Sequence, residues 1–337
     1  MKKFIWSALV ACCCLTSVAA QAQAQLVQVN ISGAEFNASA LPGALWSNYV
    51  FPSSTELAGW KAKGLKVFRM PVLWERLQPT LNGPLDSTYA GLIDQTLATA
   101  AKQGMTAIVD VHNYGYYRGN VLGSAAVPLS AYKDLTKKMA TRWAKNPGLY
   151  GYDIMNEPHD AANLIWPTAA QYAIDGIRGV DKIKPIIVEG ASWSNAQNWP
   201  LLNGGLLLLR DPSKNLIFSA HLYVDADTSG TYQTTLTTSN FDTNIGVTRA
   251  TPFVTWLNRN HLKGQIGEFG IPGSSALALQ SMDKLMAFLK TNCVPLAYWS
   301  SGAWWGSYPL SIEPDTSGDK PQWGVLKKYA SATNNCK

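Results

Sequence analysis

Short apolar segments recur along the chain, and each is followed by a stretch in which apolar residues lie three or four positions apart. The segments are rich in Val, Ile, Phe and Leu and are bounded by Gly, Pro or polar residues, which is typical of buried strands. They predict eight strands, at Val29–Phe36, Lys66–Pro71, Thr106–Asn113, Tyr150–Asn156, Pro185–Glu189, Leu216–Tyr223, Gln265–Phe269 and Pro295–Ser300.

The intervals between most of these strands have helical periodicity. Between Tyr89 and Gln103, for example, Leu92, Ile93 and Leu97 fall on one helical face, and Gly104 is a natural C-cap. The predicted helices are Ser54–Lys63, Tyr89–Gln103, Leu129–Ala144, Thr168–Val180, Thr251–Asn260, Ala276–Thr291 and Gln322–Tyr329.

The alternation of strand and helix predicts the fold. A strand followed by a helix, repeated about eight times, is typical of parallel strands joined by right-handed crossovers. At this chain length the expected closure is an α/β fold of the (β/α)8 TIM-barrel type in a single domain. The weakest unit is the fifth, because residues 193–210 have loop character and no helix can be placed there.

The first residues have the features of a secretory signal peptide. Lys2 and Lys3 precede an apolar run, Phe4–Leu15, that is too short to span a bilayer, and Ala22-Gln23-Ala24 has the small residues that a signal peptidase accepts. We therefore expect residues 1–24 to be removed and residues 25–337 to form the folded domain of a secreted protein, extracellular or periplasmic.

A second route of export is open at the same segment. Leu9-Val10-Ala11-Cys12 resembles a lipoprotein processing box, which would leave a lipid on Cys12. The apolar run continues past Cys12, which favours simple cleavage after Ala24. No later segment has the ~20 uncharged apolar residues of a membrane helix, so no membrane contact is expected after processing.

Charge and aromatic content indicate the kind of partner. The net charge of +6 falls to +4 without Lys2 and Lys3, and the remaining Lys and Arg residues form no basic block. Nucleic acid is therefore not an expected partner. The 13 Trp and 14 Tyr residues suit a neutral ligand with flat apolar faces, bound by a monomer.

Two cysteines remain after processing, Cys293 and Cys336. An even pair in an exported chain is expected to form a disulfide bond. The bond would close a loop of about 40 residues, for which chain entropy suggests a stabilisation on the order of 4 kcal/mol as an upper bound. No Cys/His cluster has the spacing of a metal site, so no structural metal is expected.

Polar residues gather where the predicted strands end. In a (β/α)8 barrel the carboxyl ends of the strands form the open mouth, whereas a strand buried on both faces should stay apolar. Six strands here end in polar or aromatic groups: Arg69, His112-Asn113, Asn156-Glu157-Pro158, His221-Leu222-Tyr223, Gly267-Glu268-Phe269-Gly270 and Trp299. Singly, each residue has a structural reading, as an ion-pair partner or a core residue. Jointly they predict a functional site.

This ordered set resembles glycoside hydrolase family 5, the cellulase family of clan A, across nearly the whole mature chain. The resemblance rests on Arg69, His112-Asn113, the segment Tyr152-Asp153-Ile154-Met155-Asn156-Glu157-Pro158-His159-Asp160, His221-Leu222-Tyr223, Glu268-Phe269-Gly270 and Trp299. It is similar to the endoglucanase branch of that family. The resemblance implies a (β/α)8 barrel, no cofactor, and hydrolysis with retention of configuration.

The resemblance also implies roles for the matching residues. Glu157 would be the acid/base and Glu268 the nucleophile, while Asn156 would hydrogen-bond the sugar 2-hydroxyl. Arg69 and Tyr223 would lie against the nucleophile. His112 and His221 would complete the polar shell, and Trp299 would be a sugar platform.

The chemistry of glycosidic cleavage fits such a pair, since it needs one protonated and one ionised carboxyl group. In a retaining site the two stand about 5–5.5 Å apart. We expect Arg69 to lower the pKa of Glu268 and so to favour the nucleophilic carboxylate, while Glu157 supplies the proton.

Aromatic residues in the predicted mouth loops are candidate platforms for sugar rings. They are Trp46, Tyr116, Tyr117, Trp193, Trp199, Trp304 and Trp305, of which Trp46 and Trp193 are the preferred candidates.

The leading prediction is an endo-β-1,4-glucanase acting on β-glucan. One alternative keeps the mechanism but changes the polymer to mannan, xyloglucan or mixed-linkage glucan. Another is a non-catalytic carbohydrate-binding barrel, which the presence of every expected polar residue disfavours. A metal-dependent hydrolase is disfavoured because the chain has only four His.

Overall fold

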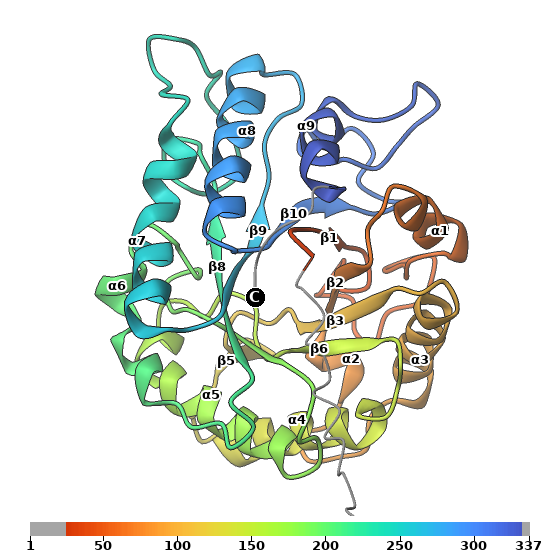
Figure 1. The fold of residues 1–337 in the computed structure, drawn as a ribbon. Helices are drawn as coiled ribbons and strands as arrows, with labels where there is room; N and C mark the ends of the chain where they lie inside the picture. Colours follow the sequence, from red (N-terminus) through yellow and green to blue (C-terminus); the bar gives the residue numbers. More distant parts are fainter. Residues whose placement is uncertain (1–24, 332–337) are drawn as a thin grey trace, which may run out of the picture.

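The structure, a computed structural model that describes residues 25–331, is a closed barrel of eight parallel strands (Figure 1). Around the barrel the strands are β1 (Val27–Ile31), β2 (Val67–Val72), β3 (Thr106–Val111), β6 (Leu149–Asp153), β7 (Ile186–Glu189), β8 (Leu216–Leu222), β9 (Gly264–Phe269) and β10 (Leu296–Ser301), which pairs with β1. All eight predicted strands are confirmed, and so is the predicted fold class.

Helices surround the barrel and cover its outer face (Figure 1). The long ones are α1 (Ser54–Ala62), α3 (Ser87–Lys102), α4 (Leu129–Trp143), α5 (Ala162–Arg178), α7 (Ile245–Asn260), α8 (Ala276–Thr291) and α9 (Pro321–Ala330). Three begin with a capping side chain, since Ser53, Asp86 and Ser275 each accept a hydrogen bond from a backbone N–H three residues on. Such caps satisfy N–H groups that have no partner within the helix.

The predicted starts of α5 and α7 were wrong by about two turns. Both predicted helices start next to a proline, a residue that is favoured in the first turn of a helix. In the structure Pro167 and Pro252 lie inside their helices, which begin at Ala162 and Ile245. Both prolines stand in the second or third turn, where the helix continues despite the missing N–H.

Several short elements have no clear signal in the sequence. The fifth unit contains a one-turn helix, α6 (Trp199–Leu202), and a 3-10 helix, η1 (Gly204–Leu208), in place of a long helix. A second one-turn helix, α2 (Trp74–Leu77), follows β2, and a hairpin of β4 (Tyr116–Tyr117) and β5 (Asn120–Val121) follows β3. Elements of two to five residues are too short to show a hydrophobic period.

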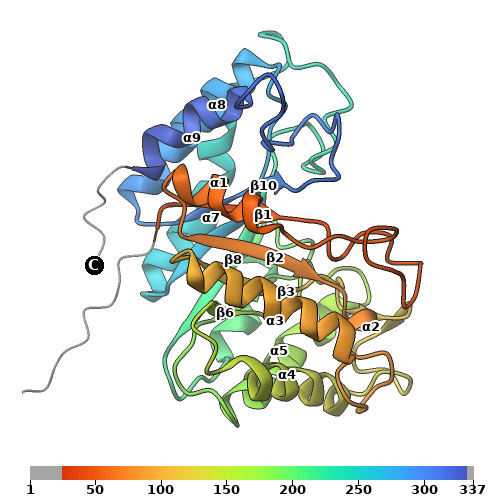
Figure 2. The same ribbon diagram turned by 90° about the vertical axis from the view of Figure 1, so that its right-hand side faces the viewer.

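The parallel strands bring their carboxyl ends to one end of the barrel. In Figure 2, β2 points to the right, and long loops gather on that side. The register of β2 with β3 is unbroken from Val67 opposite Thr106 to Val72 opposite Val111. The pairs β1–β10, β9–β10, β3–β6 and β8–β9 each contain one register shift. The loops at the carboxyl ends are therefore held close together by a rigid barrel.

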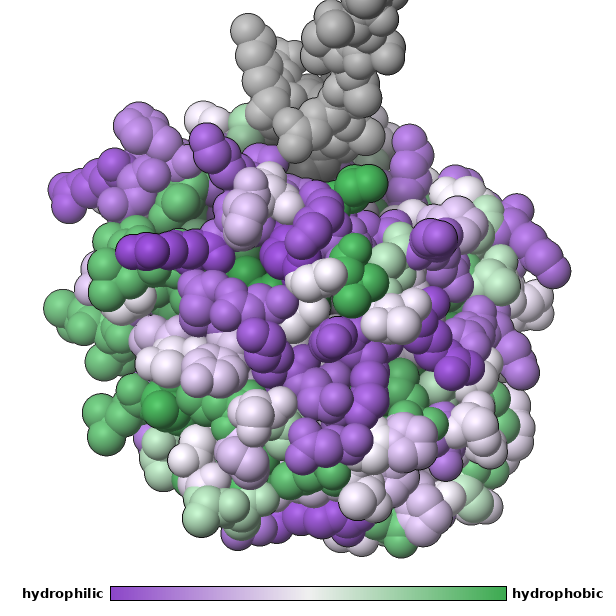
Figure 3. Space-filling view, turned by 90° about the horizontal axis from the view of Figure 1, so that it is seen from below, coloured by the Kyte–Doolittle hydropathy of each residue, from purple (hydrophilic) through white to green (hydrophobic). Residues whose placement is uncertain are grey.

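The surface mixes polar and apolar residues. Figure 3 shows hydrophilic groups interrupted by smaller hydrophobic ones over the lower face. Within residues 25–331, no helix has both the length and the apolar character needed to cross a bilayer. The predicted signal peptide, Cys12 and Cys336 lie outside the described residues, so export and the Cys293–Cys336 bond stay predictions.

Candidate active site

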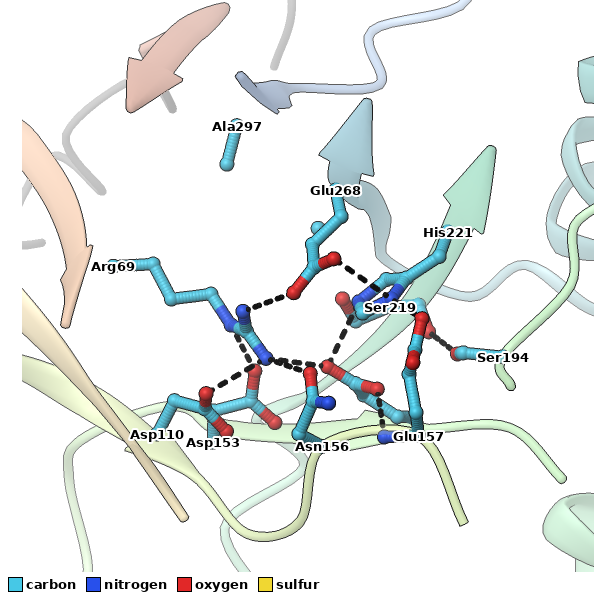
Figure 4. A network of polar contacts seen from close by, with 12 residues as sticks. Arg69, Asp110, Asp153, Asn156, Glu157, Ser194, Ser219, His221, Glu268 and Ala297 are labelled. Atoms are coloured by element: carbon cyan, nitrogen blue, oxygen red, sulfur yellow. Dashed lines mark hydrogen bonds and ion pairs between the residues drawn. The ribbon is translucent and has the colours of Figure 1, made fainter. Parts of the chain in front are cut away.

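Arg69 is the centre of a polar network inside the barrel (Figure 4). The prediction placed it at a strand end, but it stands in the middle of β2 with its side chain fully buried. Four carboxylates contact its guanidinium: Asp153 at 2.8 Å from Nε, Asp110 at 2.9 Å and Glu189 at 2.8 Å from Nη2, and Glu268 at 2.8 Å from Nη1. Burial lowers the pKa of Arg69, but these carboxylates outweigh it and hold the pKa well above its usual value.

Glu157 follows β6 in a left-handed backbone conformation, with φ 43°. That conformation is unfavourable by roughly 1–2 kcal/mol for a residue with a side chain. It is held by a hydrogen bond of 2.7 Å from the Glu157 N–H to Oε2 of Glu189. Its side chain is 15% exposed and points toward His221, with Oε1 2.6 Å from Nδ1 of the imidazole.

Glu268 projects inward from β9, opposite Glu157, with its side chain 6% exposed. Arg69 donates to Oε1 at 2.8 Å, and the Tyr223 hydroxyl donates to Oε2 at 3.0 Å. One carboxylate oxygen each of Glu157 and Glu268 and a ring nitrogen of His221 lie within 4.8 Å of one another. The two predicted carboxylates therefore meet in one site.

His221 lies between acidic groups on both sides of its ring. Nδ1 is 2.6 Å from Glu157 Oε1, and Nε2 is 3.0 Å from Glu189 Oε1. Burial lowers the pKa of His221, but Glu189, Glu268 and Glu157 outweigh it and raise the pKa well above its usual value. Each ring nitrogen faces a carboxylate oxygen, an arrangement that suits the protonated imidazole, in which both nitrogens donate.

Arg69 lowers the pKa of Glu268, as expected, but it does not set the net direction of the shift. Burial raises the pKa of Glu268, and Glu157 raises it further. His221 and Arg69 lower it, but without reversing the direction. Glu189 differs because its opposing cations, His221 and Arg69, overcome the effect of burial and lower its pKa. The sequence shows which charges are present but not how far each is removed from water.

Two further residues complete the network. His112 directly follows β3 and contacts Asp110 Oδ2 at 2.7 Å through Nδ1, and its ring lies parallel to that of Trp299 at 5.7 Å. Asn156 uses Oδ1 to accept from Arg69 at 2.8 Å, while its buried Nδ2 has no hydrogen-bond partner within the described part of the chain. An unsatisfied buried donor costs about 1–3 kcal/mol, and a ligand hydroxyl would relieve that cost.

The cleft extends on both sides of the carboxylate pair. One cavity of about 480 Å³ is lined by Glu268, His112, Trp299 and Tyr308, among others. A second of about 330 Å³ is lined by His221, Ser192, Trp193 and Asn195, among others. Glu157, Tyr223 and Ser229 line both cavities. An elongated ligand can therefore pass across the two carboxylates.

The sequence profile of the cellulase family, glycosyl hydrolase family 5, matches residues 29–304. The chain belongs to this family. It is therefore a glycoside hydrolase, as the resemblance implied, and its closed barrel is the fold of its structural neighbours in the cellulase family.

Named relatives within the cellulase family are endoglucanases. Endoglucanase 3 of Humicola insolens is 33% identical over 307 residues, which cover 89% of this chain and 76% of that protein. Endoglucanase Cel5A of Pseudomonas stutzeri, in complex with cellobiose, aligns with a TM-score of 0.89 and 44% identity over 93% of this chain and 94% of that one. An endo-beta-1,4-glucanase of Xanthomonas axonopodis pv. citri aligns with a TM-score of 0.84 and 36% identity over 91% and 98%.

The candidate aromatic platforms of this cellulase-family chain differ in exposure and in whether they line the cleft. Trp193 is 48% exposed, lines the cleft and stacks on His159 at 4.7 Å with an interplanar angle of 7°. Trp299 is 9% exposed and lines the other cavity. Trp46 is 65% exposed on the loop after β1 and lines neither of these two cavities. Trp199 was wrongly placed in a mouth loop, because it begins α6 and is fully buried.

The prediction did not identify Asp110 and Glu189 as partners of Arg69. Asp110 and Glu189 lie within otherwise apolar strands, and each is fully buried. A charged residue inside a buried strand is a usable signal, since such a charge needs a partner. Asp153 contacts Arg69, whereas Glu35 accepts hydrogen bonds from Ser32 and Gly33.

Two groups of side chains in the described part of the chain have the spacing of metal ligands, and each already makes charged contacts within the protein. Asp110, Asp153 and Glu189 each place one carboxylate oxygen on the guanidinium of Arg69, so a cationic side chain already lies against them. In the other group, Glu157, His221 and Glu268, each ring nitrogen of His221 faces a carboxylate oxygen.

Proposed function

We propose that the protein is a retaining endo-β-1,4-glucanase with Glu157 as acid/base and Glu268 as nucleophile. The observation that carries the proposal is the approach of the two carboxylates, whose oxygens lie within 4.8 Å of each other across an open cleft. Retaining glycosidases hold the pair about 5–5.5 Å apart, whereas inverting enzymes need ~6.5–9.5 Å to fit a water molecule between carboxylate and sugar.

In the first step, an oxygen of Glu268 attacks the anomeric carbon while the glycosidic C–O bond breaks. Glu157 donates its proton to the departing oxygen, so that the leaving chain departs as an alcohol. In the second step, Glu157 takes a proton from water, and the resulting attack on the same carbon releases Glu268 as a carboxylate. Two inversions at one carbon give net retention.

The surroundings of each carboxylate suit its role. Arg69 and Tyr223 bond the two oxygens of Glu268 and fix the orientation from which it attacks. His221 donates to Oε1 of Glu157 and leaves Oε2 to carry the transferred proton. When the charge of Glu268 disappears in the covalent intermediate, the repulsion on Glu157 falls, which eases its ionisation as a base.

The two cavities suggest how a glucan chain is oriented. The cavity with Glu268 holds the ring that is attacked, and Trp299 offers that ring an apolar face. The cavity that contains Glu157 but lacks Glu268 holds the leaving chain, with Trp193 as its platform. Stacking of sugar C–H faces on such rings is worth roughly 0.5–1.5 kcal/mol per contact. A cleft open on both sides favours cleavage within a chain.

We further propose that the enzyme acts outside the cell as a monomer after removal of residues 1–24, with Cys293 and Cys336 bonded. The two segments with export signals resemble a signal peptide and a lipoprotein box. Mass spectrometry of the mature chain distinguishes cleavage after Ala24 from a lipid on Cys12.

Hydrolysis of carboxymethylcellulose and of glucomannan tests the substrate assignment. We expect reducing ends to appear faster on carboxymethylcellulose, with a rapid drop in viscosity that marks internal cleavage. The Glu157→Ala variant is the control for contaminating activity. Preference for glucomannan would overturn the β-glucan assignment while leaving the mechanism standing.

A further inference from the structure

The loop that follows β8, residues 225–232 (hereafter the Asp225 loop), is folded around one buried carboxylate. Asp225 is 4% exposed. Its Oδ1 accepts from the Gly230 N–H at 3.1 Å, and its Oδ2 accepts from the Ser229 hydroxyl at 3.1 Å and the Tyr232 N–H at 3.2 Å. The carboxylate thus closes the loop on itself and fixes where Gly230 lies.

Gly230 lies directly on the ring of Tyr223. A Cβ atom at this position would stand 2.7 Å from both Cδ1 and Cε1 of the tyrosine, closer than side chains pack. The residue also has φ +75°, which favours glycine. The absence of a side chain therefore allows the loop to contact the ring and confine it.

The far end of the loop is attached to the strand that carries the nucleophile. The Tyr232 hydroxyl donates to the Gly270 carbonyl at 2.6 Å and accepts from the Val224 N–H at 3.3 Å. Gly270 follows β9, two residues after Glu268. From α7, Nη1 of Arg249 donates to the Tyr223 carbonyl at 2.6 Å and to the Asp225 carbonyl at 2.7 Å.

These contacts converge on the Tyr223 hydroxyl, which donates to Oε2 of Glu268 at 3.0 Å. We propose that the Asp225 loop positions Tyr223 against Glu268, and that Gly230 is the positioning residue through which it acts. The inference rests on the proposed role of Glu268 as nucleophile. The loop also lines both cavities through Ser229, so a substrate in either cavity lies next to the loop that holds Tyr223.

The test compares Gly230→Ala with Gly119→Ala. Gly119 has the same φ of +75°, but a Cβ there meets nothing within 4 Å, so this control carries the backbone strain without the clash. Steady-state kinetics on cellopentaose should show kcat reduced about 10- to 100-fold in Gly230→Ala, with KM changed little, since a displacement near 1 Å at a reacting group can cost ~100-fold. Gly119→Ala should keep wild-type kcat.

A double-mutant comparison separates positioning from general damage. In a Tyr223→Phe background the ring has no hydroxyl to misplace, so adding Gly230→Ala should lower kcat by less than about 3-fold. An undiminished loss in that background would overturn the inference, as would wild-type kcat in Gly230→Ala itself. If Gly230→Ala does not fold, Tyr232→Phe, which removes the contact to Gly270, takes its place in the same comparison.

Covalent labelling tells a failure of this inference from a failure of the proposed function. A 2-deoxy-2-fluoro-β-cellobioside with a good leaving group should label wild-type Glu268, and more slowly in Gly230→Ala. Absence of a label on wild-type Glu268 would contradict the nucleophile assignment. Equal labelling rates in the two proteins would instead remove the positioning role of Gly230.

Discussion

The backbone N–H of Glu157 donates to a buried carboxylate oxygen of Glu189 at 2.7 Å. Glu157, the proposed acid/base, is thus oriented by a residue on the neighbouring strand β7 that is itself fully buried. The other oxygen of Glu189 contacts Arg69 at 2.8 Å and His221 at 3.0 Å. Glu189 therefore joins the acid/base to both cations of the site without lining either cavity beside it.

Replacement of Glu189 by alanine should destabilise the protein by about 3–5 kcal/mol, because Arg69 and His221 lose a buried counter-charge. Glu189→Gln, which keeps an acceptor for the Glu157 N–H, should lose less. Urea unfolding at pH 7 measures both. The matched control is Asp319→Ala, which removes an exposed partner of Lys63 and should cost at most about 1 kcal/mol. Equal stability of Glu189→Ala and wild type would contradict the network described for this residue.

Azide should rescue the two carboxylate variants with opposite stereochemistry. With β-cellobiosyl fluoride as substrate, the Glu268→Ala variant leaves open the face of the sugar from which Glu268 would attack. Azide therefore attacks the anomeric carbon directly from that face and gives the α-azide. Glu157→Ala still forms the intermediate on Glu268, and azide then gives the β-azide. Without azide, each variant should lose about 100-fold or more in kcat on cellopentaose. The same anomer from both variants would reverse or remove one of the assigned roles.

The acid limb of the pH–rate profile should lie above the range of an ordinary glutamate. Burial raises the pKa of Glu268, and the nucleophile must be ionised to attack, so kcat/KM should fall as the pH drops through a value above ~4.3. The free enzyme's pKa is read from kcat/KM on cellopentaose. An acid limb well below pH 4 would mean that Arg69 and His221 outweigh burial after all.

The Trp193 side chain should contribute to kcat/KM only for substrates that are long enough to reach it. Its alanine variant should lower kcat/KM on cellopentaose about 3- to 10-fold, the loss of one stacking contact. Turnover of β-cellobiosyl fluoride, whose leaving group contains no sugar, should stay at the wild-type rate. A matching loss on both substrates would place Trp193 on the attacked side of the cleft or give it a structural role. Trp46→Ala, which changes a residue outside both cavities, is the comparison.

The sequence predicted the barrel because its signal is repeated: eight apolar strand segments alternate with helical ones, and a single irregular unit does not disturb that order. It also predicted that Glu157 and Glu268 meet, since parallel strands carry their carboxyl ends to one edge. The same reasoning brought His221 and Tyr223 to the site, and also Arg69, although Arg69 lies in the middle of β2 and not at its end. Each of these predictions depends on position along a strand, which the hydrophobic pattern reveals.

What the sequence could not predict depends on burial and on loops. The pKa of Glu268 is raised although Arg69 lowers it, because removal from water outweighs the nearby cationic groups, and burial depth is not visible in a motif. Glu189 and Asp110 were not recognised as partners of Arg69, although a charge inside an apolar strand was the available signal. Trp46 and Trp193 look alike in sequence, and only the loop conformation separates them.

The configuration of the first product tests the central claim most directly. Proton NMR of cellopentaose hydrolysis, recorded before mutarotation equilibrates the anomers, should show the β-anomer of the new reducing end appearing first. That result requires two displacements at one carbon by carboxylates as close as Glu157 and Glu268. An α-anomer as the first product would mean direct attack by water and would contradict the mechanism.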